Sequence, residues 1–90
     1  MIHKIKLMEA FADAVLSGEK NFEIRLNDRG YQKGDYVRFI VTTSGGMKRI
    51  SHPVDERLFV ITYVLNGFGL EANYCVFGIR PCLENEGVVE

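Results

Sequence analysis

Apolar and polar residues alternate along several short stretches of the chain, and a period of two predicts β-strands. In the first stretch, residues 3–7, Ile5 and Leu7 share one side while lysines occupy the other. Residues rich in glycine, asparagine and aspartate separate the stretches, which is typical of strands joined by tight turns. The later predicted strands are residues 21–26, 36–43, 57–65 and 72–79, with a short hairpin return at 47–50.

Residues 8–17 follow a different period. Apolar side chains recur there at helical spacing while Glu9 and Asp13 face away, so the segment is predicted to be a helix packed on the core and ending at Gly18. The apolar stripe consists of Met8, Phe11, Ala12, Val15 and Leu16. One helix followed by closely spaced strands predicts an α+β fold: a small, mostly antiparallel β-barrel with the helix near the N-terminus packed against it.

Length and charge limit the function classes. The chain has 90 residues, 47% of them apolar, which suits one domain with a modest core. We expect this domain to cover residues 1–82 and the acidic residues 83–90 to form a frayed tail. The net charge of -1 and the pI of about 6.1 argue against a protein that coats nucleic acid through bulk electrostatics.

Cysteine and histidine positions indicate no metal site. Cys75 and Cys82 fit no paired zinc-ligand spacing, and His3 and His52 lie far apart in sequence. The sequence has neither a signal peptide nor an apolar run of transmembrane length, so we expect a cytoplasmic protein without a membrane partner or a disulfide. No cofactor is expected, and the oligomeric state stays open.

A densely charged segment follows the predicted helix. Strand alternation puts Asn21, Glu23 and Arg25 on one face, which Lys20 can reach from the preceding turn. An amide, a carboxylate and a guanidinium together can recognise a planar polar ligand through forked hydrogen bonds. Spacing alone favours a simpler alternative, a solvent-facing strand whose Glu23–Arg25 ion pair contributes almost no stability. The candidate ligand-binding residues are Lys20, Asn21, Glu23, Arg25, Asn27 and Asp28.

The same segment resembles the ASCH (activating signal cointegrator homology) superfamily of PUA-like domains. The matching elements are the helix end at residues 14–18, the turn at 18–20, the strand at 22–25 and the Gly34-Asp35 pair. The chain is similar to short bacterial and phage members with a core of the form GKKTFEIRKNDR…GD, whose last strand residues 74–79 also resemble. The resemblance spans residues 3–80.

This resemblance implies an RNA- or nucleotide-binding cleft between the helix and the barrel. Lys20, Glu23 and Arg25 occupy positions of the motif that lines the cleft, and Asn21 departs from the commoner threonine. The leading hypothesis is therefore a module that binds single-stranded RNA or a nucleotide. A tyrosine would stack on a base, and the candidates are Tyr31, Tyr36 and Tyr63.

An enzyme is the second hypothesis. One branch of the superfamily consists of small acetylcytidine amidohydrolases, which use a lysine, a threonine three residues later and a distant glutamate. Lys20 matches, but Glu23 stands at the threonine position, and Glu56 and Glu71 are candidates for the glutamate by location only. A lysine base must be uncharged, whereas the acidic residues near Lys20 favour the ammonium. We therefore expect Lys20 to bind a ligand, and to be catalytic only if the protein is an enzyme.

The third hypothesis is a protein-interaction module. In this case the edge of the barrel or the loop at residues 51–56 would contact a partner protein. A contiguous apolar patch on the surface would favour this hypothesis over the other two.

Overall fold

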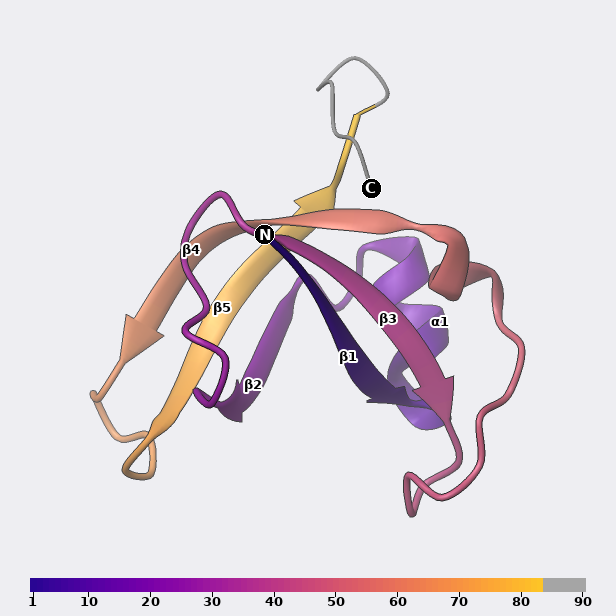
Figure 1. The fold of residues 1–90 in the computed structure, drawn as a ribbon, viewed down its shortest axis with the longest axis horizontal. Coiled ribbons are helices and arrows are strands. Elements are labelled where there is room, and N and C mark those ends of the chain that lie inside the picture. Colours follow the sequence, from indigo (N-terminus) through magenta and orange to yellow (C-terminus); the bar gives the residue numbers. More distant parts are fainter. Residues whose placement is uncertain (84–90) are drawn as a thin grey trace.

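The computed structural model describes residues 1–83, which contain one α-helix, one short 3-10 helix and five strands (Figure 1). The elements are β1 (Ile2–Met8), α1 (Glu9–Ser17), β2 (Phe22–Leu26), β3 (Tyr36–Thr42), a 3-10 helix (Pro53–Glu56), β4 (Leu58–Asn66) and β5 (Tyr74–Pro81). The predicted α+β class is confirmed, and these strands and the helix lie within two residues of their predicted positions. Gly18 ends α1 as predicted, in the left-handed conformation at φ 85°.

The polar stretch between β3 and β4 differs from its predicted structure in part. The hairpin return expected at residues 47–50 is not a strand, because a single isolated bridge, between Thr42 and Arg49, forms there. The loop expected at residues 51–56 contains the 3-10 helix, and the His52 ring accepts a hydrogen bond from the Val54 N–H at its start. The tail expected to be frayed, residues 83–90, lies outside the described residues apart from Leu83.

The five strands form one mixed and open sheet in the order β1-β3-β4-β5-β2. β1 and β3 run parallel, whereas the other neighbouring pairs are antiparallel. The expected barrel, mostly antiparallel and closed, is therefore wrong, because β1 and β2 are opposite edges of the sheet and do not pair. Turn residues predict which strands follow one another tightly, but α1 separates β1 from β2 and allows them to lie at opposite edges.

The sheet bends into an arch, with β1 and β3 on one side, β5 on the other, and β4 running across the top from the side of β3 to that of β5 (Figure 1). The core inside this arch contains side chains from every strand except β2, and α1 packs against β1, β3 and the 3-10 helix. The predicted apolar faces of β1 and β3 are confirmed as buried. The buried residues of these two strands that carry the pattern are Ile5, Leu7, Val37, Phe39 and Val41.

The apolar stripe of α1 is only partly in the core. Ala12 and Val15 are buried as predicted, but Met8, which directly precedes α1, and Phe11 are 41% and 40% exposed. Phe11 and Met8 lie toward β2 rather than toward the core, and this leaves a hollow between the helix and that strand. Within residues 1–83 there is no helix with the length and hydropathy that a membrane span would need.

Candidate functional site

Strand β2 buries the polar side chain of Glu23 and leaves its apolar side chains partly exposed. Glu23 is only 4% exposed, whereas Phe22 and Ile24 are 42% and 56% exposed. The pairing of β2 with β5 explains this orientation, because Glu23 lies opposite Phe77, a core residue. Alternation correctly predicted that Glu23 and Arg25 share a face. The simpler interpretation, in which that face is exposed to solvent, is wrong because Glu23 is buried.

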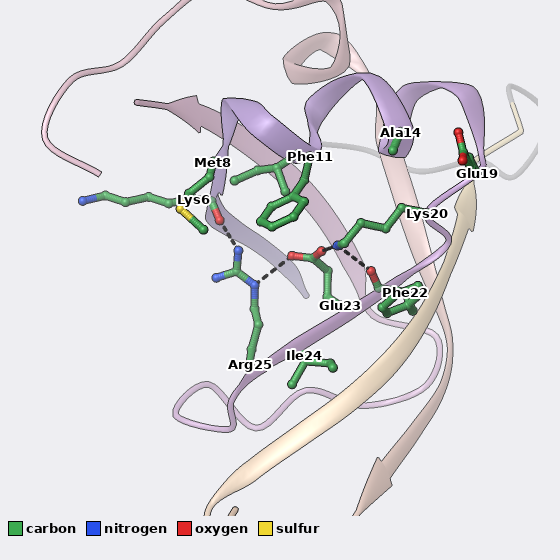
Figure 2. Close-up of a pocket in the computed structure, with 11 residues that line it drawn as sticks. Lys6, Met8, Phe11, Ala14, Glu19, Lys20, Phe22, Glu23, Ile24 and Arg25 are labelled. Atoms are coloured by element: carbon green, nitrogen blue, oxygen red, sulfur yellow. Dashed lines mark hydrogen bonds and ion pairs between the residues drawn. The ribbon is translucent and has the colours of Figure 1, made fainter. Parts of the chain in front are cut away.

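Glu23 is held between two cations. Its carboxylate accepts hydrogen bonds from the Lys20 ammonium on one side and from Arg25 Nε, 3.1 Å away, on the other. Lys20 also donates to the backbone oxygen of Phe22 at 2.8 Å. Figure 2 shows the Glu23 side chain lying between Lys20 and Arg25. A buried carboxylate needs such partners, because burial removes the water that would otherwise solvate its charge and nothing else would compensate for that loss.

Two arginines span the gap between the edge strands. Arg25 Nη2 donates to the backbone oxygen of Lys6 on β1, and Arg29 Nη1, from the loop after β2, donates to that of Lys4 at 3.0 Å. These carbonyl groups lie on the free edge of β1, where no neighbouring strand can pair with them. Side chains therefore link the two edges that backbone hydrogen bonds leave open.

A cavity of about 650 Å³ lies between α1, β1 and β2. We call it the aromatic cavity; it is lined by Lys6, Leu7, Met8, Phe11, Ala14, Glu19, Lys20, Phe22, Glu23, Ile24 and Arg25. Its lining is mainly apolar, and the Lys20–Glu23–Arg25 cluster supplies most of its polar groups (Figure 2). Few polar groups in a largely apolar hollow are the usual composition of a small-molecule site.

Two phenyl rings flank the lysine of this cavity. The Lys20 nitrogen lies 5.4 Å from the ring centroid of Phe11 and 5.1 Å from that of Phe22. Both distances are within the range of cation–π attraction. Each ring is about 40% exposed, so both have surface free for a ligand. Lys20 donates to the Glu23 carboxylate and to the Phe22 carbonyl, which leaves one of its three N–H groups for a ligand. A nitrogen that donates in this way cannot also abstract a proton.

The structure brings together three of the six predicted ligand-binding residues, Lys20, Glu23 and Arg25. Asn21 is exposed and lines a smaller hollow of about 230 Å³ next to Lys20. Asn27 has a structural role, since its side-chain oxygen accepts from the Tyr31 N–H at 3.2 Å. Asp28 is exposed and lies in a separate cavity beyond Arg25.

That separate cavity is smaller and mainly polar. We call it the arginine cavity; its volume is about 300 Å³, and it is lined by Ile24, Arg25, Leu26, Asp28, Arg29, Tyr31 and Tyr74. Tyr31 is 5% exposed, and its ring lies 4.8 Å from both His3 and Phe77, measured between centroids. Burial raises the pKa of the Tyr31 hydroxyl above its ordinary value of 10.0, although the charges of Arg25 and Arg29 act in the opposite direction.

Sequence reasoning missed the aromatic side chains of the site. Phe11 was assigned to the core with the rest of its stripe, and Phe22 was seen only as the apolar side of a strand. None of the three tyrosines proposed for base stacking lines the aromatic cavity. Tyr31 is buried, Tyr36 is the first residue of β3, and Tyr63, 64% exposed, is on the outer face of the sheet. The sequence did contain one hint. When one face of a strand carries three polar groups and the other carries apolar residues such as Phe22, alternation alone does not say which face is buried.

Neither glutamate considered for the amidohydrolase hypothesis lies at the aromatic cavity. Glu56 and Glu71 are both exposed. Across residues 1–83, no three side chains of His, Cys, Asp or Glu come together as metal ligands would. Cys75 is a free thiol, and burial raises its pKa above the ordinary value of 9.0.

Fold and site together define a class: a small α+β protein in which a mainly apolar cavity with a charged centre separates the helix from one edge of an open sheet. The chain belongs to the family described as "Domain of unknown function (DUF3850)", whose model matches residues 2–79. It is also 34% identical over 70 residues to the "Uncharacterized 12.9 kDa protein in GpA 3'region" of Escherichia phage P2. That match covers 71% of this chain, and the chain spans 64% of the relative's length.

Proposed function

We propose that this protein binds an unpaired base, of single-stranded RNA or of a nucleotide, in the aromatic cavity. The observation that carries the proposal is the position of the Lys20 ammonium between the rings of Phe11 and Phe22, next to the buried Glu23. An unpaired base needs an aromatic surface for its ring and polar groups for its edge. The cavity supplies both, and it does so at the end of α1 where the resemblance to ASCH domains implies a cleft.

Each part of the cavity has a role in this proposal. Phe22 or Phe11 stacks on the base, an interaction that tolerates every base because each has a π-face. Lys20 donates to a carbonyl oxygen on the base edge, with Glu23 holding the ammonium in place. Arg25 acts mainly as a strut, since Glu23 and the carbonyl of Lys6 already engage it.

The test is a binding titration at low salt with fluorescein-labelled short RNAs, with calorimetry for unlabelled nucleosides and nucleotides. Phe22→Leu keeps an apolar side chain but removes the ring, and we expect it to weaken binding about tenfold. Phe68→Leu is the matched control, because Phe68 is 92% exposed and lines none of the three cavities described above. Equal affinities for these two variants, or no binding by the unmodified protein, would refute the proposal.

A second candidate function, protein interaction, has its own supporting observation. The outward side chains of β2 form an apolar row that continues across Gly78 of β5 to Tyr63 of β4. The row on β2 consists of Phe22, Ile24 and Leu26, which are 42%, 56% and 46% exposed. A row of exposed apolar side chains can pack on a copy of itself, as isologous dimers require.

Sedimentation velocity tests this candidate over a range of protein concentrations. If two copies pack through this face, the protein should dimerise, and Ile24→Ser should shift it to the monomer. Met47→Ser is the control, since Met47 is 90% exposed and lies on the loop after β3. A monomer at every concentration would eliminate self-association through this face.

A further inference from the structure

The aromatic and arginine cavities adjoin each other along β2. Both are lined by Ile24 and Arg25, so the side chain of Arg25 stands between the two hollows. One hollow is mainly apolar and carries exposed phenyl rings, and the other is mainly polar. A ligand with an aromatic part and an anionic part a short distance away would occupy both at once.

The arginine cavity has hydrogen-bond donors to spare. A guanidinium carries five N–H groups. Within the described part of the chain, Arg29 uses only Nη1, in its bond to the carbonyl of Lys4, so Nε and Nη2 remain. Arg25 uses Nε and Nη2, which leaves Nη1. The Asp28 carboxylate also lines the cavity, so its three charged side chains sum to a single positive charge.

The Tyr31 hydroxyl adds a third donor. Tyr31 is 5% exposed and lines this cavity. Its hydroxyl makes no hydrogen bond among residues 1–83. Tyr31 Oη is not among the buried polar atoms without a partner in residues 1–83, so the hydroxyl is accessible and can bond a ligand in the cavity. Because burial raises the pKa of this phenol, it keeps its proton at neutral pH and can donate to an anion.

We propose that the arginine cavity binds a phosphate group, belonging to the nucleotide whose base lies in the aromatic cavity. The proposal rests on the proposed function and narrows it: the ligand is a phosphorylated nucleotide unit, free or within a single strand, rather than a nucleoside. Arg29 and Tyr31 are the recognising residues, with Arg25 between base and phosphate. Arginine and phosphate match in geometry, because forked N–H donors pair with two oxygens at once.

The experiment compares, by calorimetry on the whole chain, a nucleoside, its 5′- and 3′-monophosphates and a short single-stranded RNA that contains it. The phosphate should raise affinity about tenfold or more. Arg29→Gln and Tyr31→Phe should each remove most of that gain and leave nucleoside affinity unchanged. Inorganic phosphate should compete with the nucleotide but not with the nucleoside. A larger gain for the RNA than for either monophosphate would identify a strand as the source of the phosphate.

The controls separate this inference from the function it rests on. Lys33→Gln removes one exposed charge outside the three cavities and should leave the phosphate gain intact, and the melting temperature of each variant checks folding. If nucleoside and nucleotide bind equally well, the phosphate site is refuted while the aromatic cavity keeps its function. If Phe22→Leu leaves nucleoside binding unchanged, the proposed function itself fails.

Discussion

Glu23 is a carboxylate that two cations hold at the border between core and cavity. Its partners come from both sides along the chain, Lys20 three residues before and Arg25 two residues after. Each contact is charge-assisted, which makes it stronger than a neutral hydrogen bond. Burial of Glu23 means that the loss of its charge would leave two cations with a weaker partner and no easy access to water.

Glu23→Gln should therefore lower the free energy of unfolding by about 2 kcal/mol, because the amide keeps the shape but not the charge. Urea denaturation followed by circular dichroism measures the change. Glu71→Gln removes the same charge from an exposed loop position and should lie within about 0.5 kcal/mol of the unmodified protein. Equal stability of the two variants would show that the cluster contributes nothing to folding.

Sequence reasoning could group these residues but could not orient them. Alternation is a local property, so it placed Glu23 and Arg25 on one face of β2 correctly. Whether that face is buried depends on partners far along the chain. The carbonyl oxygen that accepts the hydrogen bond from Arg25 belongs to Lys6, 19 residues earlier. Every residue has such a carbonyl, so no pattern of side chains marks this one as the acceptor.

At the scale of elements, the pairing of β4 with β5 contains an extra residue. Ile61 lies opposite Ile79 and Tyr63 opposite Gly78, so Thr62 bulges out of the register. A β-carbon at position 78 would clash with the Thr62 hydroxyl oxygen. A bulge increases local twist, and a glycine opposite it allows the close approach.

Gly78→Ala should cost about 1–2 kcal/mol of stability, because the added methyl group meets the Thr62 side chain. The same substitution in a Thr62→Ala background should cost clearly less, since the obstructing oxygen is gone; a thermodynamic cycle of the four proteins gives the coupling. Gly45→Ala is the control, as the nearest neighbour of its added methyl group, the Met47 side chain, is at an ordinary 3.5 Å. Absence of coupling would mean that Thr62 moves aside freely.

At the scale of the whole molecule, two buried titratable groups link stability to pH. Burial raises the pKa of Tyr31 above 10.0 and that of Cys75 above 9.0. The folded protein therefore holds these protons more tightly than the unfolded chain does. Their contribution to stability is complete below pH 9 and is lost as the pH rises through the raised pKa values of the folded state.

The urea concentration at the midpoint of unfolding should accordingly decrease as the pH is raised from about 9 to about 11. Tyr31→Phe should make this decrease less steep. The phenylalanine removes the titrating hydroxyl and keeps the ring contacts. Tyr63→Phe, at an exposed position, corrects for tyrosine content and should follow the unmodified protein. A Tyr31→Phe profile that runs parallel to the unmodified one would contradict the expected linkage.

The arrangement of the sheet was the least predictable property of the molecule. The position of each strand can be predicted from the residues of that strand, and all five were located in this way. The order of the strands in the sheet cannot be predicted in the same way, because β1 pairs with β3, and α1 and β2 lie between them in the sequence. The tight turns predict a mostly antiparallel barrel, whereas the open sheet depends on a parallel pair that no turn connects.

One consequence of the Arg25 and Arg29 contacts concerns the behaviour of many molecules rather than one. A free strand edge is a template on which an extended chain from another molecule can add, and repeated addition builds fibrils. Along β1, the carbonyls of Lys4 and Lys6 are already engaged by guanidinium groups, and the lysine side chains beside them are charged and exposed. A foreign strand would have to displace both arginines first, so the residues that wall the two cavities also guard this small open sheet against aggregation.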